Sequence, residues 1–89
     1  MRALTVGDVV ISRAGRDRGR CFVVYSLADD QFVTVVDGGL RGIARPKRKR
    51  ARHLRLTDHH IDVLGGDHEI RQALKDAGYD PHVRDYKGV

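Results

Sequence analysis

Three short apolar segments, separated by tight polar connections, limit what this chain can fold into more than any other feature. They span residues 6–12, 21–27 and 32–36 and are rich in valine and other β-branched or aromatic residues. Such side chains favour strands, because they pack well on a pleated surface. Glycine, aspartate and other polar residues fill the connections, as is typical of turns between strands. This pattern predicts a small antiparallel β structure.

Apolar residues stand at consecutive positions in these segments, which indicates that both faces of the sheet are covered. The interior of a barrel would cover one face, and a helix later in the chain could cover the other. Asp67 suits the N-cap of such a helix and Gly78 its end. Its buried face would consist of Ile70, Leu74 and Ala77. A second short helix is expected over residues 58–64, with Ile61 and Leu64 facing inward.

The chain has 89 residues, about the size of a single domain. Two weaker strands are expected at residues 41–45 and 52–56. We therefore predict a mainly β fold, with a small barrel over residues 1–57. One or two helices over residues 58–89 would form an extension that packs on the barrel. We also expect the last ~10 residues to be partly mobile, as chain ends often are.

The charge is unevenly distributed along the chain. Residues 1–56 hold 13 basic and 5 acidic side chains, whereas residues 57–89 hold 4 and 7. A basic body of this kind is expected where one part of a protein faces a polyanion. Arginine outnumbers lysine by 13 to 4. Because the arginine fork grips phosphate and stacks on bases, this preference favours nucleic acid as the partner.

The connection between the first two strong segments carries the most informative chemistry. It contains four arginines, Arg13, Arg16, Arg18 and Arg20, and two glycines, Gly15 and Gly19. Glycine allows positive φ and close backbone approach, so the arginines would crowd around one tip and could straddle a phosphate backbone. Asp17 would fix the loop by accepting hydrogen bonds from turn N–H groups. The alternative is an ordinary hairpin turn with solvated arginines.

This connection resembles the KOW motif shared by several ribosomal proteins and transcription elongation factors. The likeness rests on Gly7, Val9, Val10, residues 15–20, Val23 and Val24. Gly19 matches the central glycine of the motif. Similarity extends over about residues 5–57, including 35–41 and 53–57. It points to bacterial KOW-domain RNA-binding proteins similar to large-subunit ribosomal proteins of archaeal and eukaryotic type. The resemblance implies an SH3-like barrel that contacts ribosomal RNA through the loop between its first two strands.

A dense basic run follows the third apolar segment. Seven of its eleven residues are cationic: Arg45, Lys47, Arg48, Lys49, Arg50, Arg52 and Arg55. Pro46 opposes a helix, so we expect a surface loop that enters a strand near Arg52. Like charges at this density repel one another, and a polyanion would favour their ordering. A merely solvated tract and a nuclear import signal are the alternatives.

The sequence thus predicts binding of structured RNA, with large-subunit ribosomal RNA as the main partner and ribosomal proteins as further partners. The predicted RNA-binding residues are Arg13, Arg16, Arg18, Gly19, Arg20, Arg41, Arg45, Lys47, Arg48, Lys49, Arg50 and Arg52. The alternative is a protein-interaction KOW module of the transcription or ribosome machinery. No membrane or small-molecule partner is expected, since the sequence has neither a long apolar run nor a nucleotide-binding motif. We expect a cytoplasmic, ribosome-associated protein.

Catalytic and metal sites find little support in the sequence. No nucleophile and base stand at a catalytic spacing, so we do not expect an enzyme or a cofactor. The neighbours His59 and His60 would point about 100° apart on a helix, which makes them poor joint metal ligands. Cys21 lies in an apolar run and is interpreted as a core residue. Phe22, Tyr25 and Phe32 are also predicted to be mainly core residues.

Overall fold

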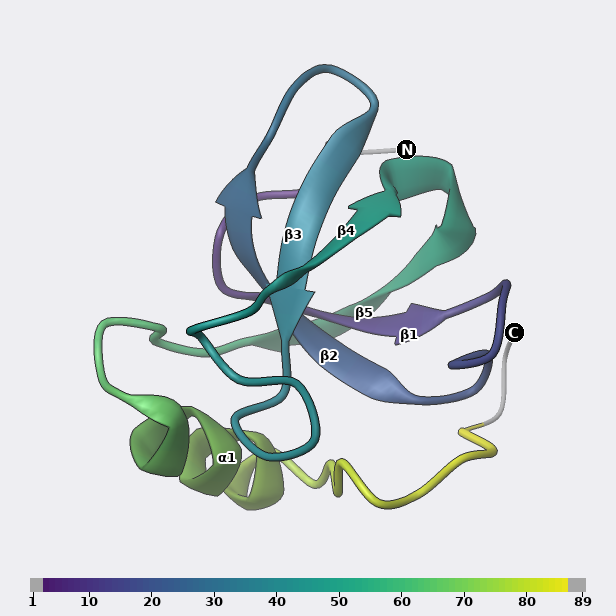
Figure 1. Cartoon of the computed structure of the whole chain (residues 1–89). Helices are drawn as coiled ribbons and strands as arrows, with labels where there is room; N and C mark the ends of the chain where they lie inside the picture. Colours follow the sequence, from purple (N-terminus) through teal and green to yellow (C-terminus); the bar gives the residue numbers. More distant parts are fainter. Residues whose placement is uncertain (1–2, 87–89) are drawn as a thin grey trace.

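A computed structural model describes residues 3–86 of the chain. Its five strands form one antiparallel sheet in the order β4-β3-β2-β1-β5 (Figure 1). The strands are β1 (Asp8–Ser12), β2 (Cys21–Leu27), β3 (Phe32–Val36), β4 (Lys47–Arg50) and β5 (Leu54–His60). A 3₁₀ helix, η1 (Ala51–His53), joins β4 to β5, and the helix α1 (Asp67–Asp76) follows the sheet. The predicted mainly β fold with a C-terminal helix is confirmed.

The sheet curls because its two edge strands are neighbours in sequence. β4 and β5 lie at opposite edges, yet only the three residues of η1 separate them. Three residues span at most about 11 Å, so the edges must approach each other. Two backbone hydrogen bonds hold the connection: Ala51 N–H donates to Gln31 O over 2.8 Å, and Arg13 N–H donates to His53 O over 2.7 Å. The result is consistent with a small SH3-like barrel.

Consecutive valines divide the core into two layers, one on each side of the sheet. The inner layer comprises Val10, Phe22, Val24, Val33, Val35 and Leu54. The outer layer comprises Val9, Val23, Val36, Ile61, Ile70 and Leu74. Successive side chains of a strand point to opposite faces, which explains why neighbouring valines enter different layers. The prediction that both faces are covered is confirmed.

Helix α1 covers the outer face of the sheet. Ile70 and Leu74 are fully buried there, as predicted, and each such burial stabilises the fold by about 1.5–3 kcal/mol. The helix ends before Gly78, which adopts a φ of 96°. The N-cap is Gly66, so the prediction of Asp67 at that position is wrong. The carboxylate of Asp67 instead accepts a hydrogen bond of 2.8 Å from the backbone N–H of Ile43, and thereby ties the β3–β4 loop to α1.

Two expected elements are absent from residues 3–86. Residues 41–45, predicted as a weak strand, form turns. Residues 58–64 do not form a helix, because β5 continues to His60 and an irregular segment follows. Ile61 is buried as predicted, but Leu64, which was also expected to face inward, is 91% exposed. Both secondary-structure predictions are wrong, and in the second case pairing of β5 with β1 overrides the local helical pattern.

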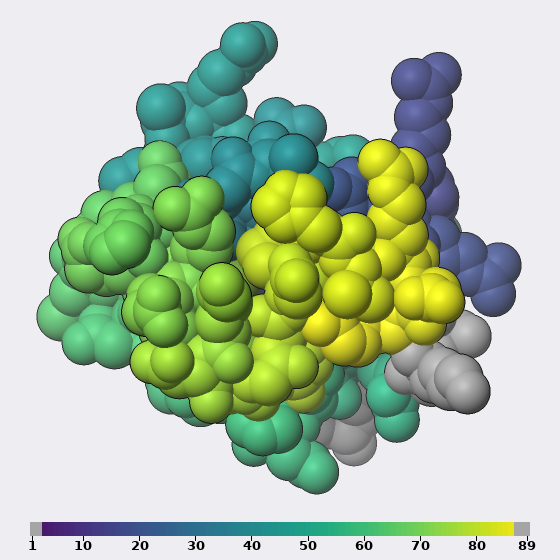
Figure 2. Space-filling model, turned by 90° about the horizontal axis from the view of Figure 1, so that it is seen from below, coloured from purple at the N-terminus to yellow at the C-terminus, as the bar shows by residue number. Residues whose placement is uncertain are grey.

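The segment that follows α1 returns to the barrel. Figure 2 shows residues of this segment in yellow, spread beside the green helix across one face of the molecule. Pro81 is fully buried, and the backbone N–H of Tyr86 donates to Gly19 O over 2.8 Å. The described part of the C-terminal segment therefore contacts the β1–β2 loop. Expected mobility of the chain end stays a prediction, and residues 87–89 lie outside the described residues.

Candidate nucleic-acid interface

A buried ion pair anchors the tip of the β1–β2 loop to β4. Lys49 is 8% exposed, and its amino group lies 2.8 Å from Asp17 Oδ1. The same amino group donates to Ser12 Oγ and to Ala14 O, each over 3.0 Å. Lys47 lies 3.0 Å from the second carboxylate oxygen of Asp17. Three hydrogen-bond acceptors thus satisfy the buried ammonium group of Lys49, as a buried charge requires.

The environment of Asp17 stabilises its charged form. Burial on its own would raise the pKa of this carboxyl group, but hydrogen bonds from Lys49, Ser12 and Lys47 outweigh burial and lower the pKa to about 2. The Ser12 hydroxyl contributes a bond of 2.7 Å. Asp17 therefore carries a full negative charge at neutral pH and cancels much of the lysine charge beside it.

Asp17 shapes the loop through side chains rather than through the turn N–H groups that sequence reasoning assigned to it. The backbone N–H groups of the turn bond to backbone carbonyls: Arg18 to Gly15, Gly19 to Ser12, and Arg20 to Asp17. The prediction that the Asp17 carboxylate accepts hydrogen bonds from these N–H groups is therefore wrong. Its two lysine partners lie at least 30 residues away on β4 and could not be identified before the topology was known.

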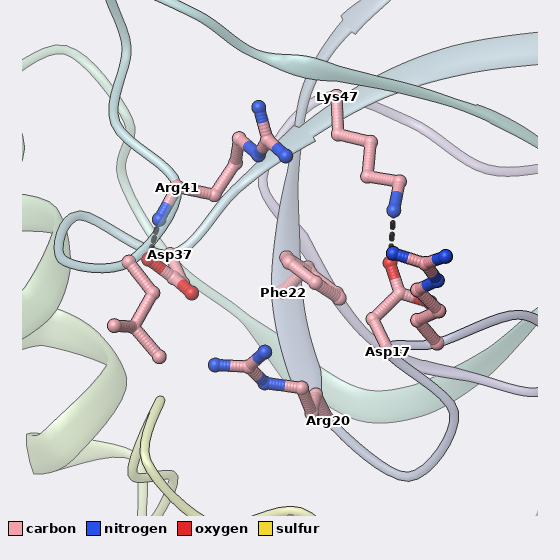
Figure 3. Close-up of a pocket in the computed structure, with 8 residues that line it drawn as sticks. Asp17, Arg20, Phe22, Asp37, Arg41 and Lys47 are labelled. Atoms are coloured by element: carbon pink, nitrogen blue, oxygen red, sulfur yellow. Dashed lines mark hydrogen bonds and ion pairs between the residues drawn. The ribbon is translucent and has the colours of Figure 1, made fainter.

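A cleft of about 130 Å³ brings together cations from three separate segments (Figure 3). Arg16 and Arg20 come from the β1–β2 loop, Arg41 from the β3–β4 loop and Lys47 from β4. The other lining residues are Asp17, Phe22, Asp37 and Leu40. We call this site the cleft. It joins the predicted loop and the predicted basic run on one surface, which sequence alone could not establish.

Asp37 positions the loop that carries Arg41. It is 1% exposed, and its Oδ1 atom accepts hydrogen bonds of 2.8 Å from the backbone N–H groups of Gly39 and Arg41. The backbone N–H of Asp37 in turn donates to Arg41 O over 2.9 Å. This closed turn fixes the backbone of Arg41 beside the cleft and leaves its guanidinium group to extend from the loop (Figure 3).

The chain is similar to archaeal ribosomal proteins over most of its length. It is 34% identical to large ribosomal subunit protein eL14 of Saccharolobus islandicus (strain L.S.2.15 / Lassen #1), over 96% of this chain and 91% of the relative. Identity to eL14 of Hyperthermus butylicus is 33%, over 88% and 82%, and identity to eL14 of Pyrobaculum aerophilum is 32%, over 96% and 84%. The chain belongs to the eL14 family. No family model matches it, so the KOW motif and the bacterial grouping stay predictions.

The basic run of this eL14-family chain forms a strand where a surface loop was expected, so that prediction is wrong. β4 pairs with β3, and its sequence Lys-Arg-Lys-Arg alternates between two faces. Lys47 and Lys49 lie opposite the inner-layer residues Val35 and Val33 and point toward Asp17. The second expected strand begins at Leu54, because Arg52 belongs to η1.

The two arginines of β4 lie on the other face, over Phe32. The guanidinium carbons of Arg48 and Arg50 are 4.2 and 4.7 Å from the centre of the Phe32 ring, within cation–π range. Arg48 also forms an ion pair of 3.0 Å with Asp29, and Arg50 donates to Gln31 Oε1 over 3.0 Å. We call these five residues the Phe32 patch. Phe32 is only half-buried, so its predicted place in the core is wrong.

The remaining predicted site residues differ in their exposure. Five of these arginines are exposed, the last of them on η1: Arg13, Arg16, Arg18, Arg45 and Arg52. Gly19 is buried, with a φ of 87°, and a side chain there would collide with the carbonyl oxygen of Arg84. Gly19 and the enclosed Lys49 therefore shape the β1–β2 loop rather than present groups on the surface.

Other kinds of site find no geometric support in the described part of the chain. Residues 3–86 contain no group of three histidine, cysteine, aspartate or glutamate side chains that could hold a metal ion. Cys21 is buried, and burial raises the pKa of its thiol to about 12, which makes it unreactive at neutral pH. None of the helices between residues 3 and 86 has the length and apolar character of a membrane span.

Proposed function

We propose that this chain is a non-catalytic protein of the large ribosomal subunit that binds structured ribosomal RNA in the cytoplasm. The observation that carries the proposal is the convergence of Arg16, Arg20, Arg41 and Lys47 on one cleft. Membership of a family whose members are named as large-subunit ribosomal proteins supports it. Neighbouring ribosomal proteins are proposed as additional partners.

The proposed contacts are directed mainly at phosphates. The contact set comprises Arg13, Arg16, Arg18, Arg20, Arg41, Arg45, Lys47 and Arg52, with Arg48 and Arg50 in a secondary role. The major groove of A-form RNA is too narrow for side chains to read, so shape and backbone contacts are the expected mode. With about six phosphates neutralised, log K should fall against log salt with a slope of about −4 to −5.

A protein-interaction module is the alternative function, and it would use the outer face of the strands together with the acidic helical part of the chain. Helix α1 occupies that face, where Ile70 and Leu74 are fully buried against Val9, Val23 and Val36. These three valines are therefore covered by the helix, which favours the RNA-binding proposal.

Charge reversal at a matched pair of exposed residues tests the proposal. Arg16→Glu places a negative charge at the cleft, whereas Lys75→Glu makes the same change on α1, away from it. Affinity for fragments of large-subunit ribosomal RNA, measured by fluorescence anisotropy at several salt concentrations, should fall at least tenfold for Arg16→Glu. The Lys75→Glu variant should bind nearly as well as the unaltered protein. Equal effects of the two changes, or no binding at low salt, would contradict the proposal.

A further inference from the structure

The side chain of Arg20 contains a buried donor that no group within residues 3–86 satisfies. Its Nε atom is shielded from solvent and has no hydrogen-bond partner among the described residues. Buried donors are almost always paired, and leaving one unpaired costs about 1–3 kcal/mol. In Figure 3 the guanidinium group of Arg20 extends from the start of β2 into the cleft that Phe22 and Asp37 also line. The fold thus leaves part of the hydrogen-bonding capacity of Arg20 unused beside the cleft.

The other charges of the cleft favour an anion as that ligand. Four cations line it, whereas the two carboxylates, Asp17 and Asp37, are already engaged within the protein. Asp17 is paired with Lys47 and Lys49, and Asp37 accepts two backbone hydrogen bonds. The Arg41 guanidinium makes one bond of 3.2 Å, to Arg45 O, and retains further N–H donors. The formal charge of the lining residues is thus +2.

The size and walls of the cleft favour a phosphate over a nucleobase. A volume of about 130 Å³ accommodates several water-sized atoms, such as the oxygens of one tetrahedral oxyanion. The aromatic ring in the lining, Phe22, is only 3% exposed and presents no open face for a base to stack on. A guanidinium group matches a phosphate in geometry as well as in charge, because its parallel N–H donors can bond to two phosphate oxygens at once.

We propose that the cleft is a subsite for a single phosphate group, held by Arg20 and Arg41 and supported by Arg16 and Lys47. The occupant is a backbone phosphate of the bound RNA, so this part of the inference rests on the proposed function. Arg20 supplies its terminal N–H groups, and its unpaired Nε–H lies behind them as a reporter of the bound group. The subsite would fix the register of the protein on the RNA backbone without reading its sequence.

Nuclear magnetic resonance can observe the Nε–H group of Arg20 directly. Inorganic phosphate is titrated into ¹⁵N-labelled protein at constant ionic strength, with chloride as the reference anion. The Arg20 Nε–H resonance should shift and saturate with phosphate and remain unmoved with chloride. Arg55, exposed on β5 and outside the cleft, is the internal control, and its Nε–H resonance should show no saturating shift. A linear response at Arg20 that matches Arg55 would overturn the subsite, whether or not RNA binds.

Variants that keep the charge test the fork geometry. The backbone amides of Gly39 and Arg41, beside the cleft, should also shift and saturate with phosphate in the unaltered protein. Arg20→Lys should abolish that response and weaken RNA binding by roughly tenfold, whereas Arg55→Lys should change neither. Arg41→Lys is a second cleft variant in case Arg20→Lys does not fold. Unchanged RNA affinity in both cleft variants would overturn the subsite and leave the proposed function standing. Saturable phosphate binding without any RNA binding would instead retain an anion site and remove both the RNA occupant and the proposed function.

Discussion

The cleft and the Phe32 patch contain the same kind of residue in different states of engagement. In the patch, Arg48 and Arg50 lie over an aromatic ring and bond to Asp29 and Gln31. In the cleft, Asp37 bonds to the backbone of Arg41 and Asp17 pairs with Lys49, so neither carboxylate is paired with an arginine side chain there. The Nε atom of Arg20 has no partner among the described residues. The comparison teaches that the density of basic residues in a sequence is a poor measure of the charge available to a ligand.

The largest expected difference concerns the two carboxylates that serve these regions. Asp17→Asn removes the charge that compensates buried Lys49, and loss of one partner of a buried pair costs about 3 kcal/mol or more. Asp29→Asn makes the same change at an exposed pair, where solvent screens the charges, and should cost much less than Asp17→Asn. Urea unfolding followed by circular dichroism measures both. Similar losses of unfolding free energy in the two variants would mean that the buried Asp17–Lys49 pair stabilises the fold no more than the exposed pair does.

Low pH should destabilise the folded chain through the carboxyl group of Asp17. The pKa of Asp17 in the folded chain, about 2, lies below the ordinary value of 3.8. Its contribution to stability is therefore fully present above about pH 4 and is lost as the pH falls toward 2, by on the order of 1–2 kcal/mol. Unfolding free energies measured between pH 2 and pH 5 test this slope. Asp17→Asn should flatten the curve, and a variant with an unchanged slope would exclude Asp17 as its source.

RNA affinity should distinguish Arg41 of the cleft from Arg48, which is paired within the Phe32 patch. Arg41→Gln removes a cleft guanidinium, so affinity for ribosomal RNA fragments should fall roughly tenfold and the salt slope should decrease by about 1. Arg48→Gln removes a guanidinium already paired with Asp29 and should weaken binding about threefold or less. Anisotropy titrations at several salt concentrations provide both quantities. If the Arg48 variant lost as much affinity as the Arg41 variant, the patch would be an equal part of the interface.

The smallest expected effect isolates the ring beneath the two arginines. Phe32→Leu keeps an apolar side chain but removes the aromatic face, so the fold should lose about 1 kcal/mol. Phe22→Leu is unsuitable as a control because Phe22 belongs to the inner core. The exposed change Leu27→Ala provides a better one and should be nearly neutral. Thermal melts of both variants measure the difference, and equal melting temperatures would mean that the cation–π contacts contribute little.

Sequence reasoning succeeded where apolar residues determine the structure. β1, β2 and β3 follow directly from their valine-rich segments, and Ile70 and Leu74 identify the buried face of α1. It failed where distant pairing decides the outcome. β4 contains only cations, and it becomes a strand because β3, Asp17 and Phe32 provide partners for its two faces.

The cleft could be predicted only in part. The local arginine cluster was visible in the sequence, and the resemblance to a KOW motif gave its RNA-binding meaning. The approach of Arg41 and Lys47 to the β1–β2 loop depends on the curled sheet and on the turn that Asp37 closes. The enclosure of Lys49 was also missed, although the strict alternation of lysine and arginine in β4 is a signal for two different environments.

The alternation in β4 has a consequence for insertions and deletions in the preceding loop. A shift of β4 by one residue would turn arginines toward the enclosed carboxylate of Asp17 and lysines toward Phe32. A guanidinium group is bulkier than the ammonium group seated there, so the altered pairing would be crowded on one side and poorly packed on the other. The alternating sequence of β4 thus specifies its register against β3. Insertions and deletions between β3 and β4 must therefore be accommodated in the loop before Lys47.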